Sequence, residues 1–520
     1  MPAGPRAGRR QGREVAGRKA PRRPALIWVA EPGTRSPHGF PSDSLSHILF
    51  GVTQIRFGTD GWRGVIAEEF TVANVRKVAT AIARYVIRAE RPQSGVLIGY
   101  DSRFGGPLFA RAAAEAISAT GTPIWLSDAP CPSPALSLLV RQREAAGGIM
   151  ITASHNPSRW NGVKYKASYG SSALPGIVAE IEKELGEVLA NGSRRGLPPQ
   201  KDLIHSLHVR APYLETLSKL IDWERLRESK FRFVVDPMHG AACGLFRELC
   251  ARHGVACDEI RGNYDPLFGG VNPEPIQPHV AALQEAVRNG KYDAGFAADG
   301  DGDRIGAVDA DGTFITPQQI FAILLWHLAG TRKQSGDVAK TFSTTKMIDK
   351  IAKKFGRAVF ETPIGFKHIC ELMLERDILL GGEESGGFAT KMYLPERDAT
   401  VTALLLAEVM AWHGKRLGEL VKMLHDEFGV HHYGRVDLEL RAGQKERAVQ
   451  HFGSRVETLL EWRIERREDI DGQKLYFGEA GWVLVRVSGT EQMLRVYAET
   501  AHPQMTERVL DEVCTQVRKL

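Results

Sequence analysis

The sequence lacks the features that would place it in several special classes of protein. Its 520 residues contain no apolar run near the ~18–20 residues that a membrane-spanning helix needs. Six cysteines occur without CxxC pairs or zinc-ligand spacing, which is typical of reduced, mostly buried thiols. We therefore expect no membrane partner, no disulfide framework and a cytoplasmic location.

Net charge is also absent from most of the chain. The formal charge of +6 arises in residues 1–50, which hold nine Lys/Arg and three Asp/Glu, whereas the other 470 residues hold 59 of each sign. Proteins that bind nucleic acid usually carry a basic patch or stripe. The neutral body therefore gives no electrostatic reason to expect a nucleic-acid partner.

The first residues show no helical or strand periodicity and are rich in Arg, Pro and Gly. A short apolar segment at 24–30 follows basic residues, as in a signal peptide, but Glu31-Pro32 comes next instead of a small-x-small cleavage site. An Arg-rich, acid-poor composition also fits a transit peptide. We interpret residues 1–53 as a disordered basic tail or the result of a wrongly chosen start codon.

Beyond the tail, helical and strand-like segments alternate three times and then give way to a strand-rich region. Apolar spacing predicts helices at 71–90, 211–227 and 443–460, and a short apolar run predicts a buried strand at 147–153. The alternation predicts an α/β fold with three repeated α/β/α domains that have mixed sheets, a smaller C-terminal α+β domain, and a site between the domains. The predicted domains are 54–205, 206–312, 313–430 and 431–520.

The segment TASHNP (152–157) follows directly on the predicted strand 147–153. A serine just past the carboxyl end of a strand projects into the crevice where α/β sheets bind ligands. The G-x-S-x-G pattern of a hydrolase nucleophile is absent around Ser154. Taken alone, the segment could equally be a helix N-cap or a turn.

The segment DGDGDR (299–304) is more specific. Three carboxylates at a spacing of two would repel each other unless a hard cation such as Mg²⁺ or Ca²⁺ neutralised them. An EF-hand would need Gly and Glu where Arg304 and Ala310 stand, and a dinucleotide-binding loop would not carry three acids. A solvated acidic turn is the alternative. The predicted metal ligands are Asp299, Asp301 and Asp303.

Two further loops combine glycine with polar side chains. GGEESGG (381–387) would let the backbone approach a polyol closely while carboxylates bind its hydroxyl groups, although it could be any glycine-rich turn. RVSGTE (486–491), with Arg495 beyond it, has the composition of a phosphate-binding loop or of a polar hairpin turn.

Together, the four loops resemble the motifs of the α-D-phosphohexomutase superfamily, the phosphoglucomutase/phosphomannomutase enzymes, and occur in that family's order. FGTDGWRG (57–64) is similar to the family's first active-site loop. The resemblance covers residues 54–520. It implies three related α/β domains and a smaller fourth domain around a central cleft.

The resemblance also implies roles for individual residues. Ser154 would carry the phosphoryl group, and its phosphoserine oxygen would complete the site of one Mg²⁺ ion bound by the three aspartates. The remaining catalytic candidates stabilise charge or move protons: Arg63, Arg304, His155 and Lys164. The substrate-binding candidates are Lys367, Glu383 and Ser385 for the sugar side, and Arg486, Ser488, Gly489, Thr490 and Arg495 for the non-reacting phosphate.

The implied reaction interconverts hexose 1-phosphate and hexose 6-phosphate through a phosphoserine and a 1,6-bisphosphate, with glucose 1,6-bisphosphate as the priming intermediate. Glu383-Glu384-Ser385 favours glucose over glucosamine phosphates, with mannose open. Gly387 replaces a histidine that is common in phosphomannomutase-type members. The alternatives are a phosphomannomutase, or a phosphoglucosamine or N-acetylhexosamine mutase, of the same family. A catalytically silent sugar-phosphate-binding protein is disfavoured by the retained Ser154 and aspartates. We expect hexose phosphates as partners and a monomer or dimer.

Overall fold

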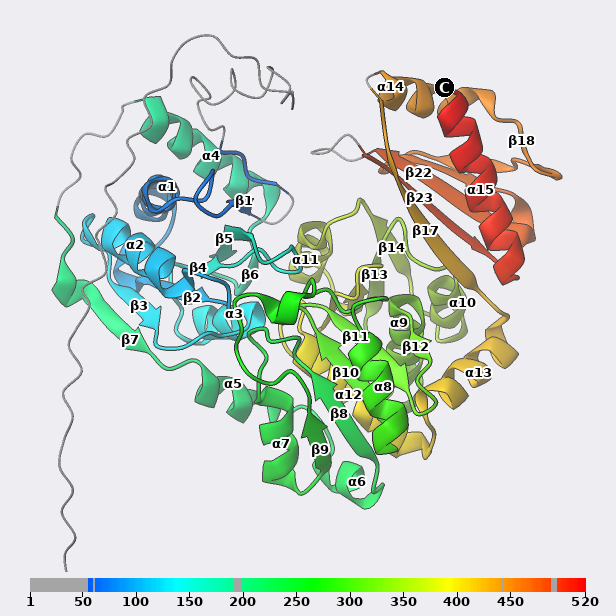
Figure 1. Cartoon of the computed structure of the whole chain (residues 1–520), viewed down its shortest axis with the longest axis horizontal. Helices are drawn as coiled ribbons and strands as arrows, with labels where there is room; N and C mark the ends of the chain where they lie inside the picture. The colour runs from blue at the N-terminus through cyan, green and yellow to red at the C-terminus, as the bar shows by residue number, and fades with distance from the viewer. Residues whose placement is uncertain (1–54, 59–60, 191–197, 442, 488–492) are drawn as a thin grey trace, which may run out of the picture. The chain divides into compact units, whose positions relative to one another are not determined.

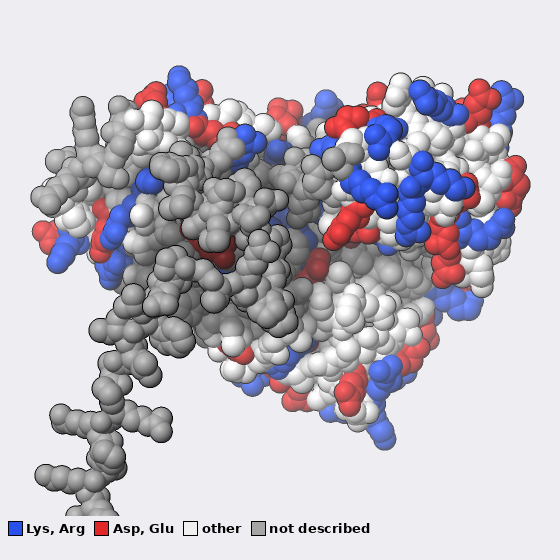
Figure 2. All heavy atoms as spheres, turned by 45° about the horizontal axis from the view of Figure 1, so that its top comes forward, with Lys and Arg blue, Asp and Glu red and all other residues white. Residues whose placement is uncertain are grey.

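The computed structural model describes residues 55–58, 61–190, 198–441, 443–487 and 493–520. Its strands form four main sheets, each built from a consecutive part of the chain (Figure 1). The first three are mixed sheets with helices, and the fourth is antiparallel, so the predicted fold class is confirmed. Within the described residues, no helix combines the length and apolarity needed to cross a bilayer. Figure 2 shows basic and acidic side chains interspersed among the described residues of the visible face.

The first sheet has the strand order β1-β5-β4-β2-β3-β7, with β6 paired to β5. Strands β2, β3, β4 and β7 are parallel, whereas β5 runs antiparallel to both β4 and β1. Every residue of β2 and β4 is buried, as expected for short apolar strands covered on both faces. The elements are β1 Trp62–Val65, α1 Val72–Ala89, β2 Val96–Tyr100, α2 Gly106–Ser118, β3 Ile124–Ser127, α3 Ser133–Gln142, β4 Gly147–Ile151, β5 Trp160–Ala167, β6 Ser171–Ser172, α4 Pro175–Ala190 and β7 Ile204–Leu207.

The second sheet has the order β12-β11-β10-β8-β9, and the third has the order β14-β13-β15-β16. The second unit comprises α5 Arg210–Leu217, α6 Trp223–Glu228, β8 Arg232–Asp236, α7 Leu245–His253, β9 Ala256–Glu259, α8 Ala281–Gly290, β10 Ala294–Ala298, β11 Ile305–Asp309 and β12 Phe314–Ile315. The third comprises α9 Pro317–Trp326, β13 Asp337–Thr341, α10 Met347–Lys354, β14 Val359–Thr362, α11 Phe366–Glu375, β15 Ile378–Gly382, β16 Phe388–Thr390, α12 Ala399–His413 and α13 Leu417–Phe428.

The fourth sheet is antiparallel, with the order β17-β23-β22-β21-β20, and α15 packs on β17 and β23. Its elements are β17 His432–Glu439, α14 Gln444–Gln450, β18 Thr458–Leu459, β19 Trp462–Arg463, β20 Arg466–Glu468, β21 Gln473–Tyr476, β22 Gly481–Val487, β23 Met493–Thr500 and α15 Pro503–Lys519.

Helix α12 lies at the centre of the largest hydrophobic cluster, which joins α3 to the second and third sheets. Residues 399–410 are all buried, and apolar residues lie around the whole helix, with Thr400, Thr402 and Glu408 as the polar exceptions. Such a helix is stable only when other elements surround it. The second and third units therefore share this core, in addition to a smaller hydrophobic cluster that each has of its own.

Two predicted helices are shorter in the structure. The helix predicted at 211–227 divides into α5 and α6, because the Asp222 side chain accepts a hydrogen bond from Arg225 N (3.0 Å) and caps a new helix. The helix predicted at 443–460 ends in a short π-helical turn at 451–455. There Arg467 donates to the carbonyl oxygens of Phe452 and Val456, which fixes the exit of the chain.

Lys474 on β21 gives the structure a testable dependence on pH. Its buried Nζ donates to the carbonyl oxygen of Phe342 (2.6 Å), and burial lowers its pKa to about 7 although Glu361 lies 3.9 Å away. An unfolded lysine has a pKa near ~10.4, so the unfolded chain binds the additional proton between pH 7 and 10. The free energy of unfolding should therefore rise with pH, by at most about 2–3 kcal/mol between pH 7 and 9.

Thermal melting at pH 7, 8 and 9 checks this prediction. The wild-type melting temperature should increase over the series, and Lys474→Met should reduce the increase because the titrating group is gone. An equal increase in the variant would show that other groups cause it.

Candidate active site

The predicted loops occupy equivalent places in their sheets. In each unit the loop joins two neighbouring antiparallel strands: β4 to β5, β10 to β11, β15 to β16, and β22 to β23. In the first three units, the strand before the loop also pairs with a parallel neighbour. The first three polar loops therefore begin at the carboxyl end of a strand in a mixed sheet, which is where α/β sheets bind ligands.

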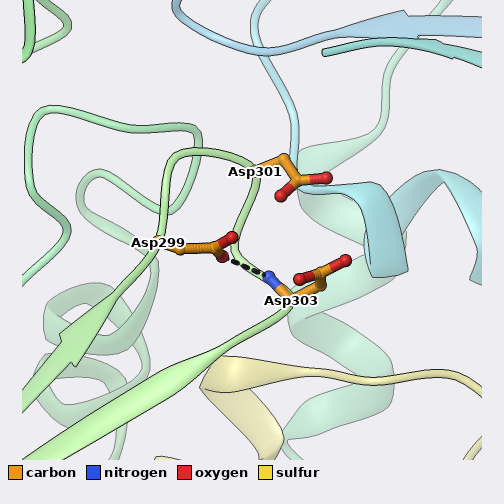
Figure 3. Close-up of side chains that lie close together, drawn as sticks. All are labelled: Asp299, Asp301 and Asp303. Carbon is orange, nitrogen blue, oxygen red and sulfur yellow. Dashed lines mark hydrogen bonds between the residues drawn. The ribbon is translucent and has the colours of Figure 1, made fainter. Parts of the chain in front are cut away.

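The β10–β11 loop brings three carboxyl groups together. Asp299, Asp301 and Asp303 are fully buried and offer oxygen atoms within 4.8 Å of one another. Figure 3 shows their side chains converging, with the Asp303 main-chain N–H donating to Asp299 Oδ1 (2.8 Å). The main-chain N–H of Arg304 donates to the same oxygen (3.0 Å), so the loop folds around Asp299.

The composition of this cluster fits a hard divalent cation. Asp301 Oδ1 and Asp303 Oδ1 are buried and have no hydrogen-bond partner among the described residues. Unpaired buried carboxylate oxygens are costly, and oxygen-only ligands are those that Mg²⁺ prefers. The three aspartates are therefore suited to hold Mg²⁺.

The aspartates differ in their electrostatic surroundings. Burial and the charges of Asp301 and Asp303 raise the pKa of Asp299 well above its usual value. Burial alone would also raise the pKa of Asp301, but the charge of Lys164 and the hydrogen bond from Ser133 outweigh it and lower that pKa. A bound cation would remove the repulsion that raises the pKa of Asp299.

Ser154 lies directly against this cluster. Its side chain is buried, and its Oγ donates to Asp299 Oδ2 (2.8 Å). Nδ1 of His155 lies 3.4 Å from the same Oγ. Burial and the positive charges of Arg304 and Arg63 hold the pKa of His155 well below its usual value, so its imidazole is neutral at neutral pH.

The predicted basic residues surround the same cluster. Lys164 on β5 is buried, and its Nζ donates to Asp301 Oδ2 (2.9 Å) and Asp303 Oδ2 (3.1 Å). Arg63 on β1 donates to Asn156 Oδ1 (2.6 Å), next to the serine. Nε of Arg304 lies 3.9 Å from Asp303 Oδ1, which is within ion-pair range but too far for a hydrogen bond.

Arg397 connects Glu383, in the loop between β15 and β16, to the aspartate cluster. Its Nη1 donates to Glu383 Oε2 (3.0 Å), and its Nη2 donates to Asp303 Oδ2 (2.8 Å). Ser385 Oγ lies 3.4 Å from Glu383 Oε2. A Cβ atom at Gly387 would lie 2.3 Å from Cδ of Arg397, so the bridge depends on glycine at that position.

The predicted phosphate anchor forms a second cluster on the fourth sheet. Arg486 and Arg495 are cross-strand partners on β22 and β23, whereas Ser488, Gly489 and Thr490 lie outside the described residues. Nε of Arg486 lies 3.0 Å from Asp471 Oδ2, and the same oxygen accepts a hydrogen bond from Ile364 N (2.9 Å). Asp471 thus links Arg486 to the loop before α11. Lys367 lies in the first turn of α11 and is partly buried.

Sequence reasoning missed several residues at this site. Ser133 Oγ donates to Asp301 Oδ2 (2.5 Å), Arg397 bridges two loops, and Arg103 holds the backbone around Ser154. Ser133 and Arg397 stand in no recognisable motif. Arg103 had a weak signal, because the charged pair Asp101 and Arg103 directly follows a buried strand.

Comparison with known proteins places the chain in a family. It matches the models for phosphoglucomutase/phosphomannomutase alpha/beta/alpha domain I over residues 54–190, domain II over 211–312, domain III over 316–428, and the C-terminal domain over 444–516. The chain therefore belongs to the phosphoglucomutase/phosphomannomutase family of the α-D-phosphohexomutase superfamily.

Relatives extend over almost the whole body of the chain. A phosphoglucomutase/phosphomannomutase of Thermococcus kodakarensis is 29% identical over 463 residues, 88% of this chain and 96% of that protein. A phosphoglucosamine mutase of Carboxydothermus hydrogenoformans is 30% identical over 466 residues, 89% of this chain and 99% of the relative. The crystal structure of a candidate phosphomannomutase from Thermus thermophilus has 34% identity and a TM-score of 0.78, covering 89% of this chain and 99% of that one.

These matches define the class of activity. The chain is a phosphohexomutase, an isomerase that transfers a phosphoryl group within a hexose phosphate. The relatives differ in the sugar that their names give, so they do not define the substrate of this chain.

Proposed function

We propose that this phosphohexomutase interconverts glucose 1-phosphate and glucose 6-phosphate through a phosphorylated Ser154, with glucose preferred over mannose. The observation that carries the proposal is the position of Ser154 Oγ, which is buried and 2.8 Å from Asp299 Oδ2 beside two further carboxylates. A hydroxyl group in this place suits the transfer of a phosphoryl group that a divalent cation neutralises.

Each half of the reaction breaks one phosphorus–oxygen bond and forms another. The bond between phosphorus and Ser154 Oγ breaks and Oγ takes up a proton, while the C6 hydroxyl of glucose 1-phosphate takes the phosphoryl group and releases its proton to a base. Neutral His155 is the better candidate for that base, because Lys164 donates to two carboxylates. The resulting 1,6-bisphosphate turns, and its C1 phosphoryl group returns to Ser154 Oγ, which releases its proton. The bond between O1 and phosphorus breaks, and O1 stays bonded to carbon and gains a proton.

The remaining predicted residues bind and stabilise. When bound by Asp299, Asp301, Asp303 and the phosphoserine, Mg²⁺ would neutralise charge on the transferring group. Arg63 donates to Asn156 in the serine loop, and Nε of Arg304 lies 3.9 Å from Asp303 Oδ1, so these two arginines are the candidates to stabilise the same charge.

Recognition of the sugar falls to the loop between β15 and β16. Glu383 is buried and held by Arg397, so its carboxylate is pre-oriented for vicinal hydroxyl groups, with Ser385 beside it. Carboxylates accept hydrogen bonds from hydroxyl groups, which suits Glu383 to the hydroxyl groups of a hexose.

A coupled assay across a panel of sugar phosphates tests the proposal. With Mg²⁺ and a trace of glucose 1,6-bisphosphate, kcat/KM should be highest for glucose 1-phosphate, lower for mannose 1-phosphate, and lowest for glucosamine 6-phosphate assayed in its own direction. A higher value for mannose or glucosamine would overturn the glucose preference. No turnover of any of the three would overturn the proposed function.

Arg486→Ala tests the proposed phosphate anchor. A bidentate, charge-assisted grip contributes about 1.5–3 kcal/mol per bond, so KM for glucose 1-phosphate should rise about 10- to 100-fold. Phosphorylation of Ser154 by glucose 1,6-bisphosphate should persist at lower efficiency, and more of the bisphosphate should escape during turnover. Steady-state kinetics measure the change in KM, and the amount of free glucose 1,6-bisphosphate formed during turnover measures its escape.

The control for this variant is Arg463→Ala, which removes an exposed arginine of β19 from the same domain. Its KM should equal that of the wild type. If Arg486→Ala lowered the melting temperature but left KM unchanged, Arg486 would be a structural residue of the hairpin instead of a phosphate ligand.

A further inference from the structure

Arg103 sits at the centre of the loop that carries Ser154. It follows β2, and its side chain is only 2% exposed. The guanidinium donates to four main-chain carbonyl oxygens of the loop: those of Ser154 (2.6 Å), Asn156 (2.7 Å), Pro157 (2.9 Å) and Trp160 (3.0 Å). One side chain therefore holds the backbone of the whole turn between β4 and β5.

Asp101 completes this arrangement from the other side. Its Oδ2 accepts hydrogen bonds from Arg103 Nε (3.1 Å) and from Thr152 Oγ1 (2.6 Å). The Thr152 hydroxyl oxygen in turn accepts the main-chain N–H of Ser154 (2.8 Å). The buried Asp101–Arg103 pair thus engages both the N–H and the carbonyl group of Ser154, directly or through one hydroxyl.

The backbone of Ser154 needs this support. Its φ of +54° lies in the left-handed region, which a serine rarely adopts without compensating contacts. The metal loop also approaches closely: a Cβ atom at Gly300 would lie 2.5 Å from the Ser154 carbonyl oxygen. The direction of the Ser154 Oγ toward Asp299 therefore depends on a backbone conformation that Arg103 and Asp101 hold in place.

A residue of the second unit covers the arginine. The ring of Phe268, itself 1% exposed, lies 4.9 Å from the guanidinium carbon. A cation on an aromatic face and away from water makes stronger hydrogen bonds to carbonyl groups than an exposed one. Arg103 thus contacts both the serine loop and the unit that supplies the three aspartates.

We propose that Arg103 is the positioning residue for the phosphoryl-carrying serine. By turning four carbonyl groups inward, it aims Ser154 Oγ at the aspartate cluster and keeps the phosphorus in line with the acceptor hydroxyl. The inference rests on the proposed function of Ser154. A displacement of about 1 Å can lower a reaction rate about 10²-fold. Loss of the Arg103 hydrogen bonds should therefore slow phosphoryl transfer more than it weakens substrate binding.

Single-turnover transfer by Arg103→Lys tests this role. Lysine keeps the charge but cannot donate to four carbonyl groups at once. The protein is phosphorylated with glucose 1,6-bisphosphate, the phosphoserine is counted by intact mass, and its loss to glucose 1-phosphate with Mg²⁺ is followed by rapid quench. Per phosphorylated molecule, transfer should be about 10- to 100-fold slower, with KM for glucose 1-phosphate and Mg²⁺ affinity within about twofold of wild type.

Two further variants keep the test decisive. Thr152→Val removes only the hydroxyl that holds Ser154 N–H, so it should slow transfer in the same sense, and it decides the question if Arg103→Lys does not fold. Arg143→Lys makes the same substitution at a cation–π contact with Trp125 elsewhere in the first unit and should transfer at the wild-type rate.

The outcomes separate this inference from the proposed function. Wild-type transfer rates per phosphoenzyme in Arg103→Lys and Thr152→Val, with only the melting temperature lowered, would overturn the positioning role. A wild-type protein that accepts no phosphate on Ser154 would overturn the proposed function itself.

Discussion

Ser154→Ala should lose at least about 10³-fold in kcat for hexose phosphate interconversion, because no other group takes the place of a lost covalent carrier. The serine hydroxyl is buried against Asp299 and makes no contact whose loss would unfold the domain, so the variant should remain folded. The measurement pairs the coupled assay with intact-mass analysis after treatment with glucose 1,6-bisphosphate. The wild type should gain one phosphoryl group and the variant none.

Ser158→Ala provides the matched control, because Ser158 lies in the same loop and is partly exposed. It should keep both phosphorylation and activity. Wild-type-like turnover by Ser154→Ala would refute a phosphoserine mechanism, whatever the behaviour of the control.

Asp301→Asn should give the second largest loss. The substitution removes the charge of one of the three buried carboxyl groups proposed to bind Mg²⁺, and it also weakens the partner of Lys164 and Ser133. Loss of residues that merely support metal ligands costs 10–100-fold in metal affinity or activity, so loss of a direct ligand should cost at least about 100-fold. Titration calorimetry with Mg²⁺ and steady-state kinetics at saturating Mg²⁺ measure the two effects separately.

Metal removal supplies the companion test. EDTA should abolish turnover, and added Mg²⁺ should restore it, whereas Asp258→Asn, on the edge strand β9 of the same unit, should bind Mg²⁺ like the wild type. Full activity in EDTA would mean that the aspartate cluster has another purpose.

Much of the fold and part of the site could be predicted from sequence, because local rules govern them. The burial of β2 and β4 follows from short apolar runs, and the convergence of Asp299, Asp301 and Asp303 follows from their spacing on one turn between two strands. In both cases the residues that determine the structure are neighbours along the chain.

The parts that escaped prediction depend on contacts between distant segments. Arg397 meets Asp303 from 94 positions away, and Ser133 meets Asp301 from 168 positions away, so no local spacing indicates either contact. The early end of the helix predicted at 443–460 has a similar cause, since Arg467 captures its last carbonyl groups from a later strand. Periodicity reports which face of a segment is apolar, not which distant donor satisfies its end.

These distant contacts connect loops that carry separate motifs. Arg397 links the carboxylate of Glu383 to the aspartate cluster, and Lys164 links that cluster to β5 beside the serine loop. A shift of one loop would therefore displace the others, which suits the proposed mechanism, in which one sugar phosphate is held in two orientations.

The most direct test of the central claim is the kinetic competence of the Ser154 phosphoenzyme. Protein phosphorylated at Ser154 is mixed with glucose 1-phosphate and Mg²⁺, and the loss of protein-bound phosphate is followed by rapid quench alongside steady-state turnover under the same conditions. Our account predicts that the phosphate leaves Ser154 at least as fast as kcat and appears first in a hexose 1,6-bisphosphate. Loss slower than kcat, or release as inorganic phosphate only, would contradict it.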